Sequence, residues 1–224
     1  MRTLVLLAVA GAAAALAASA GRSDAAPSGP IAAAVADPGR PAADVARDAN
    51  RKPAEVMAFA GVHPGEKVGE LLPVGGYYSR LLSRAVGPAG HVYGVMPEGF
   101  VKARPQILDG LKGIGDNYTV VTSANGAPGD MAAFNKVVFD SLRPGGIYLI
   151  EDHAAAAGAG VTTTSTLHRI DPAAVKAEVE AAGFKLVGES EVLRNPADTH
   201  ALPVFDASIR GHTDKLLLKF QKPG

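Results

Sequence analysis

Two adjacent polar residues, Asp152 and His153, directly follow a strand-like apolar run at 146–151. In open α/β sheets, ligands bind at the carboxyl ends of strands, so this pair is expected beside a ligand. A histidine in that position can act as a general base, and a neighbouring carboxylate can orient its ring. We predict these catalytic roles for His153 and Asp152. The alternative is a polar pair that caps the loop.

A glycine-containing turn is the second candidate for ligand binding. It lies within residues 67–98, KVGELLPVGGYYSRLLSRAVGPAGHVYGVMPE, which predict a strand, a turn, a helix and a second strand. The turn holds Pro73, Gly75 and Gly76. Glycines let backbone N–H groups approach a ligand, and a helix N-terminus attracts negative groups. The segment therefore predicts a nucleotide-like small-molecule ligand.

Other polar residues follow predicted strands. Asn125, with Ser123, comes after a strand at 118–122 and is expected to line the same site. His168 and Arg169 follow the Gly- and Thr-rich segment 154–166, which is either a lid over a ligand or a plain loop. We expect Arg169 to pair with a carboxylate, either of a ligand or of Asp171.

Two other chemistries find little support. The sequence has no Gly-x-Ser-x-Gly elbow of the kind that serine hydrolases carry. Its six histidines match no recognised metal-ligand spacing, so we predict no metal site. Since there is no cysteine, thiolate catalysis, disulfides and a lipid-anchored N-terminus are excluded.

Strand-like runs alternate with helical patterns from Lys67 onward. This alternation predicts a doubly wound, mostly parallel sheet with helices on both faces. The last two strands have no helical pattern between them and should form an antiparallel edge. We expect strands at 68–72, 91–96, 118–122, 146–151, 184–192 and 215–222. We expect helices at 77–86, 130–142 and 171–182, one at 42–60 with a break or restart at Pro53, and a poorer one at 101–112 that Pro105 and Gly110 interrupt.

The N-terminus predicts a leader. Arg2, the apolar run from Leu4 to Leu16 and Ala18-Ser19-Ala20 fit a signal peptide cleaved after residue 20, and an uncleaved anchor is the alternative. We therefore expect a periplasmic or secreted protein without a stable membrane span after cleavage. Residues 21–41, rich in Ala, Gly, Pro and Ser, predict a flexible linker, and 42–224 a single domain.

Length and charge restrict the remaining function classes. The 224 residues suffice for one domain with a sizeable core. Lys and Arg together number 22 and balance 22 Asp and Glu, so no basic surplus indicates a nucleic-acid partner.

Four segments together resemble the class I S-adenosylmethionine-dependent methyltransferases, and most closely a bacterial branch of predicted exported methyltransferases. They are RKPAEVMAFAGV, HPGEKVGELLPVGGYYSRLLSRAVGPAGHVYGV, SLRPGGIYLIEDH and STLHRIDPAAVKAEVEAAGFKLVGES. The resemblance runs from about Arg47 to the C-terminus and implies a Rossmann-like fold with S-adenosylmethionine as cofactor.

The resemblance also implies roles for individual residues. Glu70 would be the acidic residue that closes the first strand, and Gly75 and Gly76 would let the backbone approach the cofactor. Glu98 would accept hydrogen bonds from the ribose hydroxyls. Of the two tyrosines that open the next helix, one should be core and the other beside the amino-acid end of the cofactor. Tyr77 is our candidate for the latter.

The sequence differs from the family pattern at two places. Leu72 and Val74 stand where the family has glycines, and a β-branched residue does not readily adopt a positive φ. Between Val95 and Gly146 there is one clear strand where the family has two, so the chain is expected to lack one strand–helix unit. The strand at 118–122 is either the third or the fourth of the family. We predict methyl transfer to an unknown acceptor, with a non-catalytic periplasmic binding or interaction protein as the alternative.

Overall fold

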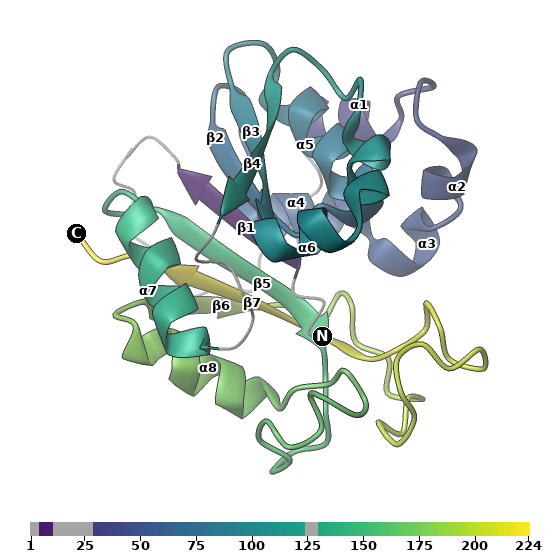
Figure 1. The fold of residues 1–224 in the computed structure, drawn as a ribbon, viewed down its shortest axis with the longest axis vertical. Coiled ribbons are helices and arrows are strands. Elements are labelled where there is room, and N and C mark those ends of the chain that lie inside the picture. Colours follow the sequence, from purple (N-terminus) through teal and green to yellow (C-terminus); the bar gives the residue numbers. More distant parts are fainter. Residues whose placement is uncertain (1–4, 11–28, 124–129) are drawn as a thin grey trace.

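The computed structural model describes residues 5–10, 29–123 and 130–224, which form a seven-stranded sheet with helices on both faces (Figure 1). The strand order is β4-β3-β2-β1-β5-β7-β6. The strands are β1 Val5–Ala10, β2 Lys67–Leu71, β3 His91–Pro97, β4 Tyr118–Ser123, β5 Ile147–His153, β6 Lys185–Glu189 and β7 Lys215–Gln221.

The strand directions confirm the predicted α/β class. β2, β3 and β4 pair in parallel, whereas β1 pairs antiparallel with both β2 and β5. β5 and β6 each pair antiparallel with β7. It follows that β2, β3, β4, β5 and β6 all run one way, with β1 and β7 reversed. The C-terminal strands are antiparallel as predicted, and β6 forms that edge.

The middle of the sheet is one strand short of a doubly wound arrangement. In such a sheet, the strand beside the first strand belongs to the second half of the fold. Here β1, from the N-terminus, takes that place beside β2. Among the described residues, β4 is the one strand between β3 and β5, and it lies outside β3. The segment 118–123 therefore holds the third-strand position.

Helices cover the two faces of the sheet in separate groups (Figure 1). On one face, α1 Gly29–Val35, α4 Pro53–Ala60 and α5 Tyr77–Val86 pack over β2, β5 and β7. On the other face, α7 Met131–Ser141 and α8 Pro172–Ala181 pack over β5 and β7. The remaining helical segments are α2 Ala42–Val45, α3 Asp48–Arg51, α6 Glu98–Ala103 and the 3₁₀ turns η1 Val74–Gly76 and η2 Pro105–Leu111.

Several helix boundaries follow their sequence signals. The Asp130 side chain caps α7 by accepting a hydrogen bond from the Ala133 N–H, and Asp171 caps α8 in the same way through Ala173. Pro172 occupies the first turn of α8. Within α7, Asn135 is buried whereas Val137 is 46% exposed, so the helix turns an amide and not this valine toward the core.

The predicted linker requires a correction. Gly29–Val35 forms α1, and Ile31 and Ala34 are buried in the core against α4 and α5. The Ala- and Pro-rich composition predicted a linker, but two of its residues form a small apolar helix face that packs against the core. Residues 21–28 of that linker lie outside the described part of the chain.

The predicted leader is described only at Val5–Ala10, which forms β1; its other residues lie outside the described part. Within 5–10, 29–123 and 130–224, no helix is both long and apolar enough to cross a membrane.

Candidate functional site

The turn after β2 carries three residues in left-handed conformation. Leu72 has φ 54°, Gly75 φ 75° and Gly76 φ 71°. Leu72 thus adopts the backbone conformation that favours glycine, while Val74 has no positive φ and leaves its side chain 51% exposed. Val74 therefore stays within the turn, as the first residue of η1, without adopting a left-handed conformation.

One side of this turn is covered and the other is open. A Cβ added at Gly76 would lie 2.6 Å from the Gly110 carbonyl oxygen, so η2 packs closely against it. The Arg80 guanidinium donates to the carbonyl oxygens of Gly75 (2.7 Å) and Gly110 (3.0 Å) and to Asp44. Gly75 is open only on the side where a Cβ would point: an added Cβ would meet no heavy atom within 4 Å there, whereas a Cβ added at Gly110 would lie 3.0 Å from the Gly75 Cα. A ligand could approach the backbone there.

Glu70 lies beneath the turn and is 3% exposed. Its Oε2 accepts a hydrogen bond from the Ser79 hydroxyl in the first turns of α5. Burial raises the pKa of Glu70 to about 7, although the Ser79 hydrogen bond opposes this shift. In this structure Glu70 therefore contacts the helix that follows the turn.

The other predicted cofactor residues are dispersed around the turn. Tyr77 points away toward the N-terminal helices, where its hydroxyl donates to Asp48 Oδ1 (2.6 Å). Pro73 is buried beside Gly94 of β3. Glu98 begins α6 directly after β3, with its side chain 45% exposed and Oε1 2.6 Å from the Lys102 Nζ. Asn125 lies outside the described residues.

Asp152 and His153 occupy opposite faces of β5, because neighbouring side chains on a strand alternate. Asp152 lines a small cavity of about 10 Å³ between the strand and helices α7 and α8. It accepts a hydrogen bond from the backbone N–H of His153 (2.7 Å), whereas the His153 ring meets the Thr213 hydroxyl through Nδ1 (2.7 Å). In this structure Asp152 therefore contacts the backbone of His153 and does not orient its ring, contrary to the expectation from the sequence.

The environment of His153 favours its neutral form. Burial, reinforced by the nearby Lys215 ammonium, lowers the pKa of His153 to about 4. The imidazole is therefore uncharged at neutral pH and can accept a proton, though as a weaker base than a solvent-exposed histidine.

A buried carboxylate that the sequence analysis passed over lies two residues before His153. Glu151 is 5% exposed and accepts hydrogen bonds from Lys215 Nζ (2.6 Å) and the Tyr78 hydroxyl (3.2 Å). Burial alone would raise the pKa of Glu151, but Lys215 and Arg51 outweigh it and hold that pKa below its usual range. Glu151 belongs to a strand-like run that is otherwise apolar, and this position could have indicated a buried carboxylate.

Arg169 also has a different partner from either one expected. Its guanidinium, 1% exposed as a residue, pairs with Asp198 (2.8 Å) and donates to the carbonyl oxygens of Ala154 and Leu202. Asp171 instead accepts from the backbone N–H groups of Gly158 and Gly160. Arg169 thus fastens the segment after β5 to the 194–214 region.

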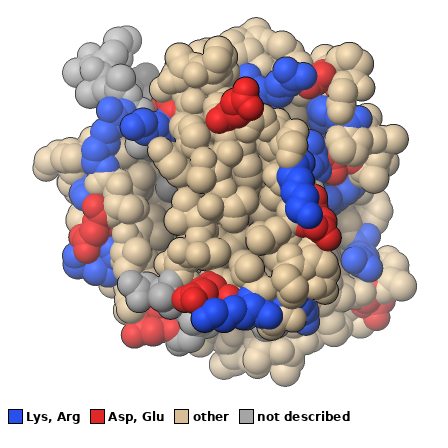
Figure 2. Space-filling model, turned by 45° about the horizontal axis from the view of Figure 1, so that its top comes forward, with Lys and Arg blue, Asp and Glu red and all other residues tan. Residues whose placement is uncertain are grey.

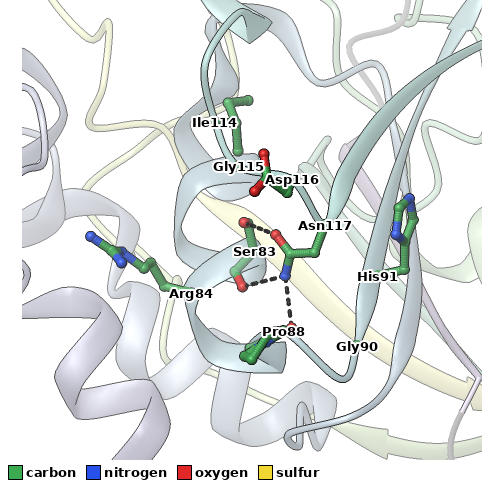
Figure 3. Close-up of a pocket in the computed structure, with 10 residues that line it drawn as sticks. Ser83, Arg84, Pro88, Gly90, His91, Ile114, Gly115, Asp116 and Asn117 are labelled. Carbon is green, nitrogen blue, oxygen red and sulfur yellow. Dashed lines mark hydrogen bonds between the residues drawn. The ribbon is translucent and has the colours of Figure 1, made fainter.

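A cavity of about 430 Å³ lies at the opposite, amino ends of the parallel strands (Figure 3). Asn117 at its wall donates to the carbonyl oxygens of Ser83 (2.9 Å) and Gly87 (2.8 Å), which end α5. These polar groups are already satisfied within the protein, so the cavity wall serves as a helix cap. It is remote in the fold from the turn at Gly75.

Charge and metal-ligand chemistry add no further site. Figure 2 shows one face on which acidic and basic side chains are scattered around a broad uncharged centre. In the part of the chain that the structure describes, no group of three or more His, Cys, Asp or Glu side chains could hold a metal ion.

Comparison with known proteins shows the fold. No protein-family model and no curated protein matches this sequence. Among solved structures, the chain is similar to a SAM-dependent methyltransferase from Aquifex aeolicus (17% identity, TM-score 0.51, covering 74% of this chain and 87% of that one). It is also similar to the [4+2]-cyclase SpnF (16% identity, TM-score 0.52, covering 81% of each chain). The chain therefore has a Rossmann-like methyltransferase fold.

Proposed function

We propose that this protein binds S-adenosylmethionine at the turn between β2 and α5 and transfers its methyl group to an acceptor still to be identified. The observation that carries the proposal is the open approach to the backbone at Gly75, where an added Cβ would meet nothing within 4 Å. This turn follows β2 at its carboxyl end and precedes a ten-residue helix. The similarity to a SAM-dependent methyltransferase supports the same ligand class.

Glu98 and Asn125 have the leading roles in holding the cofactor under this proposal. Glu98 follows β3 with an accessible carboxylate, which can accept two hydrogen bonds from a ribose diol. Asn125, which lies outside the described residues, is retained as a predicted cofactor contact from the sequence alone. Pro73, Gly76 and Tyr77 would act indirectly, by fixing the turn and the start of α5.

S-adenosylmethionine supplies a methyl group made electrophilic by its sulfonium sulfur. The chain's task is to hold the acceptor in line with that group, which depends mainly on positioning. We assign His153 as the residue that accepts a proton from the acceptor, because its ring is neutral at neutral pH. Asp152 would fix the His153 backbone rather than its ring.

Calorimetric titration of the intact chain with S-adenosylmethionine and S-adenosylhomocysteine tests the binding step. We expect micromolar dissociation constants. Glu98→Gln should weaken both by about tenfold or more, since hydrogen bonds to a charged group contribute about 1.5–3 kcal/mol. Glu180→Gln, the same change at an exposed position on α8, should leave them unaltered.

Two results would reject this assignment. One is the absence of heat at millimolar ligand with the unaltered protein. The other is equal binding by the Glu98 and Glu180 variants, which would place the ligand elsewhere.

A non-catalytic binding or interaction protein on the same scaffold is the second candidate. Arg80 and η2 cover the Gly76 side of the turn, which narrows the space for a cofactor. One fold also hosts different chemistries, and a cyclase shares this one. Failure of the titration above would favour this candidate. The periplasmic or secreted location stays a prediction from the sequence, and it depends on removal of the predicted leader.

A further inference from the structure

A strand from the predicted leader lies at the centre of the sheet, in the slot between β2 and β5. β1, Val5–Ala10, lies between β2 and β5 and pairs with both along five residues on each side. Leu7, for example, stands opposite Glu70 of β2 and Leu149 of β5. Because β1 has a neighbour on each side, its backbone groups serve one ladder or the other.

Helix α5 contacts both β2 and β5 through neighbouring side chains. The Tyr78 hydroxyl donates to Glu151 Oε2 on β5 (3.2 Å), and the adjacent Ser79 hydroxyl donates to Glu70 Oε2 on β2 (2.5 Å). Successive helical side chains diverge by about 100°, so neighbouring residues can reach two separate strands. Since β1 pairs with both, β2 and β5 lie two strand spacings apart, roughly 10 Å, whereas direct pairing would bring them to about 4.8 Å.

The backbone edges beside this slot are enclosed by the two apolar cores. One core joins Val68 of β2 to Leu149 of β5 beneath α5, and the other, on the opposite face, includes Ile150 and packs against Leu71. Backbone N–H and C=O groups left without partners in such surroundings are costly. The slot between β2 and β5 therefore requires a strand.

We propose that Val5–Ala10 is the central strand of the folded, working protein and remains attached to it, instead of being discarded with a leader. All six residues are apolar, the composition of a strand covered on both faces. The apolar run that predicts a leader fits such a strand equally well, but the same residues cannot lie in the sheet and in a membrane or be removed. This inference holds whether or not the protein binds a cofactor.

Hydrogen exchange on the unmodified full-length chain tests the strand directly. Backbone amides of Leu6 to Val9 should exchange on the order of 100-fold or more slowly than in an unstructured peptide, as ladder amides in a stable sheet do. Exchange within a few-fold of the unstructured rate would overturn the proposal.

A proline variant gives an independent readout. Leu7→Pro removes one ladder donor and should lower the melting temperature of the full chain by roughly 6–12 °C. Leu16→Pro, the same change in the same apolar run but beyond Val5–Ala10, should have little effect. Equal losses in both variants, or none in Leu7→Pro, would contradict the strand's role.

The intact mass of the protein from its natural host settles whether the strand is retained. The proposal expects a chain that still contains residues 5–10. A folded protein that begins at Gly21 would overturn it.

Discussion

Replacement of Arg169 by alanine is expected to lower the free energy of unfolding by about 3–5 kcal/mol, the usual loss when one member of a buried ion pair is removed. Arg169 and its partner Asp198 have side chains that are 0% and 2% exposed. The guanidinium also donates to the carbonyl oxygens of Ala154 and Leu202, so one side chain joins three segments. Its loss leaves the Asp198 charge buried, supported by the N–H groups of His200 and Asp214.

Thermal unfolding measures this effect. The loss corresponds to a fall in melting temperature of roughly 6–20 °C for a chain of this size. Arg84→Ala is the matched control, because Arg84 pairs with Asp37 while its side chain is 65% exposed. Such surface pairs contribute about 0–1 kcal/mol. Equal losses in the Arg169 and Arg84 variants would show that the buried pair does not fasten these segments.

Glu70→Gln is expected to stabilise the protein at pH 8 by about 3 kcal/mol. The pKa of Glu70 is about 7 in the folded state against its ordinary value of 4.5. The folded state therefore holds the proton more tightly, and stability falls as pH rises from about 4.5 to 7. Above that window the carboxylate is charged and buried, and the penalty is complete. Glutamine stays neutral and can still bond the Ser79 hydroxyl.

Urea unfolding at pH 4.5 and pH 8 tests whether Glu70 lowers the free energy of unfolding as the pH rises. The variant and the unaltered protein should be nearly equal at pH 4.5 and differ at pH 8. Glu98→Gln, at a half-exposed carboxylate, is the surface control and should not stabilise the protein by a comparable amount. A Glu70→Gln protein with the same pH slope as the unaltered chain would show that Glu70 is not desolvated. Glu70 keeps a buried charge that lowers stability above neutral pH, and such a cost is typical of functional sites.

Local chemistry made much of the fold predictable. Asp130, Asp171 and Pro172 predicted where two helices begin, because a capping carboxylate and a first-turn proline each have one favoured place. The antiparallel C-terminal strands followed from the missing helix between them. Helix α1 was missed because its two buried residues, Ile31 and Ala34, give too short an apolar pattern.

Features that depend on tertiary contacts could not be read from the sequence. Arg169 finds Asp198, 29 residues away, instead of the nearby Asp171. A run of apolar residues at the N-terminus fits both a leader and a covered strand, and pattern alone does not separate them. At the candidate site, the sequence located the open turn at Gly75, but Arg80 and η2 beside it depend on long-range packing. The roles of Glu70, Glu98, Asn125 and His153 remain predictions.

Amide chemical-shift mapping with S-adenosylhomocysteine tests the central claim most directly. We expect the amide signals of Gly75 and Glu98 to move on addition of ligand, while those of Gly87 and Gly115, beside the cavity at the amino ends of the strands, stay in place. Shifts confined to Gly87 and Gly115, or no shifts at millimolar ligand, would contradict it.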